Sequence, residues 1–467
     1  MSEIADLTVA DLLGKFSRRE LSPVEVVDDT LARIERFNPL VNAFVLVDEA
    51  GARAAARESE ARWQRGAPAG ALDGIPATIK DNIWVKGLPA RKGSRTVDDT
   101  PAPADAPAVA RLRESGAIIL GKTALPEYGW IGVCHSPLTG ITRNPWKLDR
   151  TPGGSSGGAA VAALLNLGWL HLGTDGAGSI RIPAAFTGVF GIKPSYGRVP
   201  AYPASPFTVL AHQGPLARTV DDAARMLSAI AGPDWRDISA WNTAAPDFTR
   251  NLERGVRGLR IAWSPRLGQV TKIDPEIEAA TKQAAQVFEE LGASVEEADP
   301  DLSSAAEVIR ALWESVSATI VDQVPHTERG IMDPGFVRMA QRGRANSLTD
   351  YLAAHAARSD LLLTMLKFHE RYDLLLTPQM PVPAFEVGRE APAAGEWGKE
   401  WIEWSPYTYP FNLTQQPAAS VPCGLTSEGL PIGLQIVGRP HADMQVLQAS
   451  KAFEAPRPFP VLSEPRQ

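Results

Sequence analysis

Cysteine is scarce in this sequence: Cys134 and Cys423 are the two among 467 residues. A chain of this length without a disulfide framework is typical of a reducing compartment. The N-terminus, MSEIADLTVADLL, carries acidic residues where a secretory signal would have basic ones. These features together predict a cytoplasmic protein.

Long hydrophobic runs and an excess of positive charge are missing as well. The most apolar run, residues 157–173, is interrupted by Asn166 and His171, and it is too short and too rich in glycine to span a bilayer. The net charge is -7, whereas a protein that binds nucleic acid needs a basic face. We therefore expect neither a membrane nor a nucleic acid as a partner.

Metal-ligand spacing is a third absence. The seven histidines show neither H-x-x-x-H nor H-E-x-x-H spacing, and we expect no metal and no other cofactor. What is present is an ordinary globular composition, with 44% hydrophobic and 22% charged residues. That balance is sufficient for a large buried core.

Helical periodicity dominates the N-terminal part of the sequence, up to Arg65. Apolar side chains recur at helical spacing between residues 12 and 34. Ser22-Pro23-Val24-Glu25 is a typical helix start, because serine caps the helix, proline fits its first position and glutamate its third. Residues 50–65 indicate a third, charged helix. We predict a helical N-terminal arm over residues 1–70.

Short apolar runs between glycine and proline turns follow from residue 74 onward. They are typical of buried strands, and they alternate with helical runs such as the one that opens at Asp274-Pro275-Glu276. The predicted strands include residues 75–79, 117–120, 169–172, 258–263, 293–295, 419–422 and 432–437. This alternation predicts an α/β protein with a large sheet covered by helices. Since there is no long polar linker and no internal repeat, one large domain is favoured over three small ones.

Residues 151–181, TPGGSSGGAAVAALLNLGWLHLGTDGAGSIR, place Ser155, Ser156 and Ser179 beside glycine. A flexible linker is the simplest interpretation of GGSSGG, but the block leads directly into the apolar, helix-forming AAVAALL. A nucleophile elbow is a second interpretation, because residues 153–157 match G-x-S-x-G. An elbow needs a preceding strand, and two prolines make residues 144–152 a poor one, so we keep it as the weaker alternative.

Nucleotide binding is a third interpretation, since Gly116–Thr123, GAIILGKT, matches the P-loop pattern G-x-x-x-x-G-K-T. A phosphate cradle needs an irregular loop whose amides turn inward, whereas residues 117–120 indicate an apolar strand. The cradle must also open a helix, and Pro126 makes a helix costly there. We interpret the match as accidental and keep a nucleotide-binding protein as an alternative from another class.

The same residues carry a resemblance to a known family. Lys80 lies in GIPATIKD (74–81), Ser155 in GGSSGG (153–158), and Ser179 in GTDGAGSIRIPA (173–184). Further matches are FGIKP (190–194), GPLART (214–219), PFNLT (410–414), QPA (416–418) and GLPIGLQ (429–435). In order and spacing these blocks resemble the amidase signature family over nearly the whole chain.

This resemblance implies one α/β domain over residues 1–467, with a central mixed sheet of about eleven strands covered by helices on both faces. Residues 1–70 would be the helical arm, 71–200 the catalytic core, and 201–467 the rest of the sheet with the pocket loops. The resemblance also implies a triad of Ser179 as nucleophile, Ser155 after a cis peptide bond as proton relay, and Lys80 as base. A lysine serves as a base only when neutral, and burial beside residues 75–79 would lower its pKa from about 10.4.

The residues around Ser179 suggest an oxyanion hole and its support. Backbone amides in the tight turn would point at one spot, and those that we expect to contribute belong to Gly176, Ala177, Gly178 and Ser179. Ala177 stands where many relatives have glycine. We expect Thr174, Asp175 and Arg181 to support the turn, while Ser156 either joins the triad's hydrogen bonds or caps the helix that starts near Gly157.

Substrate contacts are expected from three segments. Residues 131–134 lack the Gly-Ser-Ser type of sequence common in glutaminase relatives, and Cys134 is a pocket-lining or buried thiol. The loop 201–211 is aromatic, and tryptophans at 397, 401 and 404 fall on one helical face, which indicates either core packing or a lid. The candidate substrate-binding residues are Ile131, Gly132, Val133, Cys134, Tyr202, Phe207 and Trp401.

These observations predict a serine hydrolase that cleaves the C–N bond of small amides, anilides or carbamates (urethanes) through an acyl-enzyme on Ser179. The alternative within the family is the glutaminase subunit of a tRNA-dependent amidotransferase, which would need partner subunits. The expected partner is otherwise a small amide or carbamate substrate, and a homodimer is left open.

Overall fold

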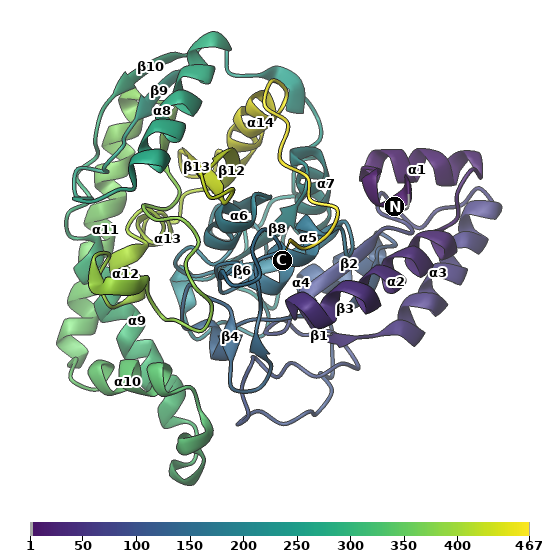
Figure 1. The fold of residues 1–467 in the computed structure, drawn as a ribbon, viewed down its shortest axis with the longest axis horizontal. Coiled ribbons are helices and arrows are strands. Elements are labelled where there is room, and N and C mark those ends of the chain that lie inside the picture. Colours follow the sequence, from purple (N-terminus) through teal and green to yellow (C-terminus); the bar gives the residue numbers. More distant parts are fainter. Residues whose placement is uncertain (1–2, 467) are drawn as a thin grey trace.

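A computed structural model describes residues 3–466, and its centre is an eleven-stranded sheet (Figure 1). The strand order is β1-β3-β2-β6-β8-β7-β12-β13-β11-β9-β10. Neighbours pair in parallel within β3-β2-β6 and β11-β9-β10 and antiparallel elsewhere. The expected mixed sheet of eleven strands is thus confirmed. Its strands are β1 (Phe44–Val47), β2 (Pro76–Lys80), β3 (Ile118–Thr123), β6 (Leu170–Asp175), β7 (Phe190–Lys193), β8 (His212–Ala217), β9 (Arg260–Trp263), β10 (Ser294–Glu297), β11 (Leu374–Pro378), β12 (Ala418–Leu425) and β13 (Pro431–Gly438).

Helices cover both faces of this sheet, with α1 to α3 at one end of the molecule and α9 to α11 at the other (Figure 1). The α-helices are α1 (Val9–Arg18), α2 (Pro23–Val41), α3 (Glu49–Gln64), α4 (Pro107–Glu114), α5 (Gly157–Leu164), α6 (Arg181–Thr187), α7 (Val220–Ile230), α8 (Pro275–Glu290), α9 (Ala305–Asp322), α10 (Pro334–Gly343), α11 (Leu348–Arg371), α12 (Trp401–Trp404), α13 (Pro410–Leu413) and α14 (Asp443–Glu454). Short 3-10 turns are η1 (Glu3–Asp6), η2 (Glu127–Gly129), η3 (Thr208–Leu210), η4 (Leu252–Arg254), η5 (His326–Ile331) and η6 (Ala393–Gly395), and a small hairpin is formed by β4 (His135–Ser136) and β5 (Gly140–Ile141). Across residues 3–466, every helix is too short or too polar to cross a bilayer.

The predicted start of the second helix is confirmed. The Ser22 hydroxyl accepts hydrogen bonds from the Val24 and Glu25 amides, and the Glu25 carboxylate accepts one from the Ser22 amide. This reciprocal arrangement satisfies amide groups that the first turn of a helix would otherwise leave without a partner.

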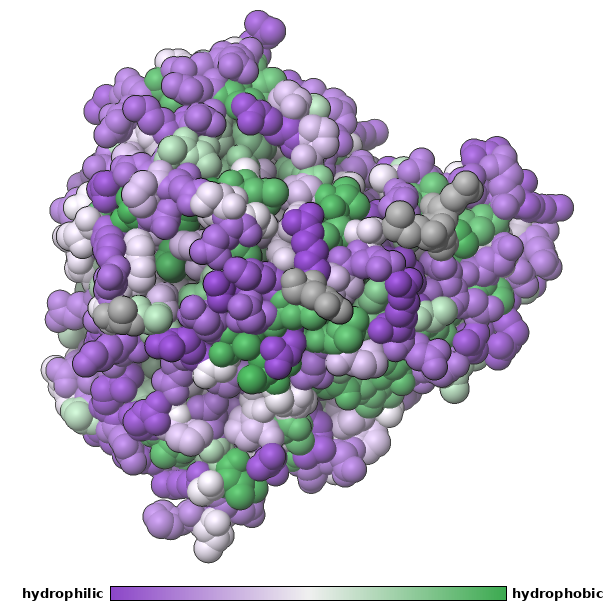
Figure 2. Space-filling view, in the orientation of Figure 1, coloured by the Kyte–Doolittle hydropathy of each residue, from purple (hydrophilic) through white to green (hydrophobic). Residues whose placement is uncertain are grey.

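Two hydrophobic cores lie on opposite faces of the sheet and decide where the polar side chains of β2 point. Ala77 and Ile79 belong to the core under α1, α4, α7 and α14. Because side chains alternate along a strand, Thr78 and Lys80 face the other side, which is the side of α5 and α6. With the apolar side chains held in these cores, the face of the molecule in Figure 2 is mainly hydrophilic.

The N-terminal arm, residues 1–70, differs from the all-helical expectation in one respect. Phe44–Val47 forms β1, which pairs antiparallel with β3 and extends the central sheet by an edge strand. A strand this short cannot show a clear alternation in the sequence. Its pairing depends on β3, whose residues lie far along the chain.

The P-loop string lies in a strand, as its apolar residues predicted. Gly116 precedes β3, and Lys122 is fully buried within it. The Lys122 ammonium donates hydrogen bonds to Asp81 Oδ1 at 3.2 Å and to the Pro89 carbonyl at 3.0 Å. The amides of a paired strand cannot form an inward-facing phosphate cradle, so this geometry argues against nucleotide binding at Gly116–Thr123.

Replacing Lys122 with methionine is expected to lower the free energy of unfolding by about 3–5 kcal/mol, because it leaves the buried Asp81 carboxylate without its ion-pair partner. Denaturant unfolding of both proteins measures this difference. The wild type should also show no shift of its melting temperature with ATP or GTP. A nucleotide-dependent shift that disappears in Lys122→Met would instead favour the nucleotide-binding alternative.

Candidate active site

Lys80 ends β2 and is fully buried among hydroxyl groups. Its Nζ lies 2.7 Å from Ser155 Oγ, 2.9 Å from Ser156 Oγ and 2.8 Å from Thr174 Oγ1. Burial lowers the pKa of Lys80 to about 7, because an ammonium ion loses its hydration there. Near neutral pH the amine is therefore present in both its protonated and its neutral form.

The two neighbouring serines reach Lys80 from the loop that precedes α5. The Gly154–Ser155 peptide bond is cis. Position 154 has to be glycine, because a Cβ there would lie 2.2 Å from the Val133 carbonyl oxygen. Ser156 occupies the cap position of α5 but makes no side-chain cap bond. Its hydroxyl donates instead to the Thr174 carbonyl at 3.1 Å, so of the two roles expected for Ser156 the geometry favours the network around Lys80.

The turn that carries Ser179 is held by a buried ion pair. The Asp175 carboxylate accepts hydrogen bonds from the amides of Gly178 at 2.6 Å and Ile180 at 3.2 Å. It also pairs with Arg181, whose Nε lies 2.9 Å away, and both side chains are fully buried. Burial by itself would raise the pKa of Asp175, but the charge and hydrogen bonds of Arg181 outweigh it and hold that pKa well below its usual range. The carboxylate is thus ionised and fixes the turn.

The backbone amides of this turn are not equivalent. The sequence suggested that the Gly178 amide would bind the oxyanion. In the structure this amide donates its hydrogen bond to Asp175, so it is not available for that role. Within residues 3–466, the amides of Gly176, Ala177 and Ser179 donate no hydrogen bond. Gly178 has φ +125°, and a Cβ there would lie 2.6 Å from that of Thr408. The position therefore requires glycine for its backbone conformation and for the close approach.

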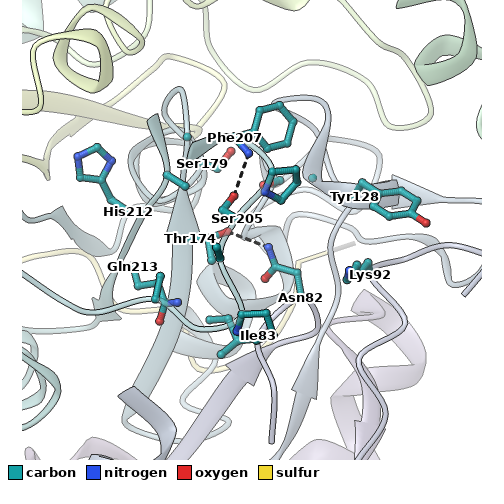
Figure 3. A pocket seen from close by; sticks show the side chains of 18 of the residues that line it. Asn82, Ile83, Lys92, Tyr128, Thr174, Ser179, Ser205, Phe207, His212 and Gln213 are labelled. Carbon is teal, nitrogen blue, oxygen red and sulfur yellow. Dashed lines mark hydrogen bonds between the residues drawn. The ribbon is translucent and has the colours of Figure 1, made fainter. Parts of the chain in front are cut away.

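Ser179 lies where two hollows meet. Its side chain forms no hydrogen bond in the described part of the chain and is 7% exposed. The main cavity, about 120 Å³ in volume, also contains Ser155, and Figure 3 shows Lys92 and Tyr128 on one side of it and His212 and Gln213 on the other. The side hollow has about 10 Å³, roughly the space of one water-sized group. Its lining is largely apolar and includes Ile131, Gly132, Ala177, Ile182, Trp313 and Trp401.

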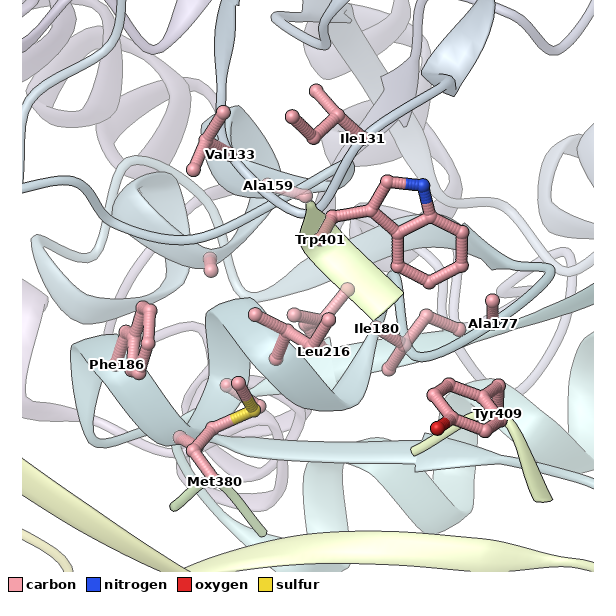
Figure 4. Packing of buried hydrophobic residues seen from close by; sticks show 14 of the residues in the cluster. Ile131, Val133, Ala159, Ala177, Ile180, Phe186, Leu216, Met380, Trp401 and Tyr409 are labelled. Carbon is pink, nitrogen blue, oxygen red and sulfur yellow. The ribbon is translucent and has the colours of Figure 1, made fainter. Parts of the chain in front are cut away.

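The predicted pocket residues fall into three groups. Phe207 lines the main cavity and stacks on Trp313, with ring centroids 4.0 Å apart. Ile131, Gly132 and Trp401 line the side hollow, and Figure 4 shows Ile131 and Trp401 packed near Ala177. The remaining three predicted residues, which are not among those lining either hollow, are Val133, Cys134 and Tyr202.

Cys134 and the tryptophan cluster have mainly packing roles. The Cys134 thiol lies 3.3 Å from Thr142 Oγ1, and burial raises its pKa, which favours the buried-thiol interpretation. Trp401 and Trp404 are both buried, in the short helix α12, while Trp397 precedes it. Trp401 therefore combines core packing with a place in the wall of the side hollow.

Some cavity residues were not found from the sequence. Asn82 donates a hydrogen bond to Thr174 Oγ1 at 3.2 Å. Its position two residues after Lys80 could have indicated from the sequence that it lies at the site. Lys92, Tyr128 and Trp313 had no such signal, since they come from a turn, from η2 and from α9. Among residues 3–466 there is no cluster of three or more histidine, cysteine or acidic side chains that could hold a metal ion.

Comparisons with known proteins show which proteins the chain as a whole resembles. The family model described as Amidase matches residues 25–447. An acylamidase of Rhodococcus erythropolis is 37% identical, over 97% of this chain and 96% of the relative. The A subunit of the Glu-tRNA(Gln) amidotransferase from Myxococcus xanthus is 36% identical over 98% of both chains. Among solved structures, a bacterial aryl acylamidase of the amidase signature family superposes with a TM-score of 0.91 at 31% identity, covering 98% of this chain and 97% of the other.

Proposed function

This chain belongs to the amidase family and is a hydrolase of amide C–N bonds, and we propose that it acts through an acyl-enzyme on Ser179, with Ser155 as proton relay and Lys80 as base. The observation that carries the proposal is the hydrogen bonding around Lys80. A fully buried amine with a pKa of about 7 lies 2.7 Å from a serine hydroxyl that opens into the same cavity as Ser179.

The hydrogens around Lys80 support this assignment. A neutral amine has two N–H groups and one lone pair. The Ser156 hydroxyl donates its hydrogen to the Thr174 carbonyl, and Thr174 Oγ1 accepts a hydrogen bond from Asn82. Ser156 Oγ and Thr174 Oγ1 are therefore both suited to accept a hydrogen bond from Lys80. The lone pair is then left for the Ser155 hydroxyl, which has no other hydrogen bond among the described residues. Neutral Lys80 is thereby oriented to take a proton from Ser155.

The reaction follows from this orientation. Ser179 Oγ attacks the carbonyl carbon and gives its proton to Ser155, while Ser155 passes its own proton to Lys80. The oxyanion is stabilised by the amides of Gly176, Ala177 and Ser179. The proton then returns through Ser155 to the leaving nitrogen as the C–N bond breaks. Water attacks the resulting ester by the same route, which releases the acid and restores Ser179.

The proposed substrates are small amides, anilides or carbamates with a hydrophobic part. The aromatic side chains Phe207 and Trp313 border the cavity, and the apolar side hollow meets it at Ser179. Amides and carbamates present the same carbonyl and the same amine leaving group, so the proposed triad is suited to both.

A glutaminase subunit of an amidotransferase is the second candidate, which the Myxococcus xanthus relative favours. Free glutamine carries an ammonium group next to its carboxylate. Among the described residues that line the main cavity, none is acidic, so that ammonium group would lack an ionised partner. The lining of the cavity therefore supports the amidase candidate over this one.

A matched panel of substrates tests the proposed function. We expect purified protein alone to release nitroaniline from acyl-4-nitroanilides and arylamines from N-aryl carbamates, and to deaminate free glutamine far more slowly. The measurement is kcat/KM for each substrate. Ammonia release from glutamine with no turnover of the nitroanilides or carbamates would replace the amidase candidate with the amidotransferase candidate.

A further inference from the structure

Lys92 is a cation in the wall of the main cavity, and no described residue provides it with an anionic partner. It is half-buried and lies next to Tyr128, with its Nζ 5.8 Å from the centre of the ring (Figure 3). Within residues 3–466 it forms no ion pair, and burial lowers its pKa. By contrast, the fully buried Lys122 is paired with Asp81.

The described lining of the cavity offers Lys92 no negative charge, so a bound ligand is the group that can pair with it. None of the described residues that line the cavity is acidic, and Lys92 is the one lysine or arginine among them. An ammonium group that is partly removed from water and unpaired is costly, and a charged ligand that pairs with it recovers that cost. Its backbone is also held in place, since the Lys92 carbonyl accepts a hydrogen bond from the Tyr128 amide at 2.7 Å.

We propose that Lys92 selects substrates that carry a carboxylate on the portion occupying the main cavity. This rests on the proposed function, because it concerns the same site, and it adds a substrate class: amides, anilides or carbamates with an acidic group remote from the scissile bond. Lys92 pairs with that carboxylate and Tyr128 covers the side chain of Lys92. The apolar side hollow accepts no charged group, so the two hollows give the substrate a direction.

Two matched substrate pairs test this proposal. The first is glutaryl-4-nitroanilide with its methyl ester, which places the carboxylate on the acyl side. The second is N-butyryl-4-aminobenzoate with its methyl ester, which places it on the leaving amine. We expect the wild type to have the higher kcat/KM for the acid in one of the pairs. In Lys92→Gln the ratio of acid to ester should fall roughly tenfold, mainly through KM.

Three further variants make the result specific. Lys92→Arg should retain the preference for the acid, and Lys92→Glu should reverse it. Lys86→Gln removes the same charge from an exposed lysine outside the cavity and should keep the wild-type ratio. The preference of the wild type should also weaken in 0.5 M NaCl, as expected of a partly exposed charge pair (about 3–10 Å screening length).

The outcomes separate this inference from the proposed function. Suppose that the amide bond of the methyl ester substrates is cleaved in a reaction that requires Ser179, but that Lys92→Gln leaves the acid-to-ester ratio of kcat/KM unchanged. Lys92 then does not select a carboxylate, and the amidase mechanism stands. An equal fall of the ratio in Lys86→Gln would also overturn the inference, because net charge would then explain it. If no substrate is cleaved, or Ser179→Ala is as active as the wild type, the proposed function itself fails.

Discussion

Replacing Ser179 with alanine is expected to lower kcat/KM for acyl-4-nitroanilides and N-aryl carbamates by roughly 10⁴- to 10⁶-fold, the range known for loss of a catalytic nucleophile. Without Oγ no ester with the substrate forms, and Ser155 and Lys80 have no nucleophile to deprotonate. The change should hardly affect folding, since the Ser179 hydroxyl makes no hydrogen bond in the described part of the chain. Steady-state kinetics and a thermal melt measure both effects.

Ser205→Ala is the matched control for Ser179→Ala. Ser205 lines the same cavity, but its hydroxyl accepts a hydrogen bond from the Phe207 amide and lies outside the lysine network. Mass spectrometry of the wild type mixed with a slowly hydrolysed carbamate should find the added acyl group on Ser179. Full activity of Ser179→Ala, or an acyl group on Ser155 or Ser156, would contradict the assignment and return attention to the nucleophile elbow.

Replacing Lys80 with methionine is expected to lower kcat/KM by roughly 10³-fold or more, since it removes the general base. The wild type should also show the titration of this amine. Because the base acts when neutral and its pKa is about 7, kcat/KM should rise with pH up to about 7 and level off above it. Below pH 7 the rate should fall about tenfold per pH unit, as for a single ionisation.

The pH profiles of variants decide whether Lys80 is the titrating group. The residual activity of Lys80→Met should lack the inflection near pH 7. Lys122→Met also removes a fully buried lysine, from the neighbouring strand, and should keep the inflection although the protein is less stable. An inflection that survives in Lys80→Met would assign the titration to another group and would contradict the role of Lys80 as base.

The sequence by itself determined much of the fold, because many of its signals are local. The Ser22 helix start, the apolar strand within Gly116–Thr123 and the presence of a large sheet follow from neighbouring residues, whereas the mixed, eleven-stranded form of the sheet was implied by the family resemblance. The spacing of Lys80, Ser155 and Ser179 was also visible, through its resemblance to a family. A strand as short as β1 was missed, since its stability comes from pairing with β3 rather than from its own residues.

Only the tertiary structure decided how these residues meet. The alternation of β2 turns Lys80 toward α5, where three hydroxyl groups surround its amine. The Asp175 carboxylate, which binds the Gly178 amide, also accepts a hydrogen bond from Asn412, a residue far along the chain. Lys92, in a turn, and Trp313, in α9, reach the cavity from segments far apart in the chain. The residues that we propose for the chemistry could thus be found from short sequence motifs. The cavity, and the place of Lys92 in its wall, arise from long-range packing that no local pattern encodes.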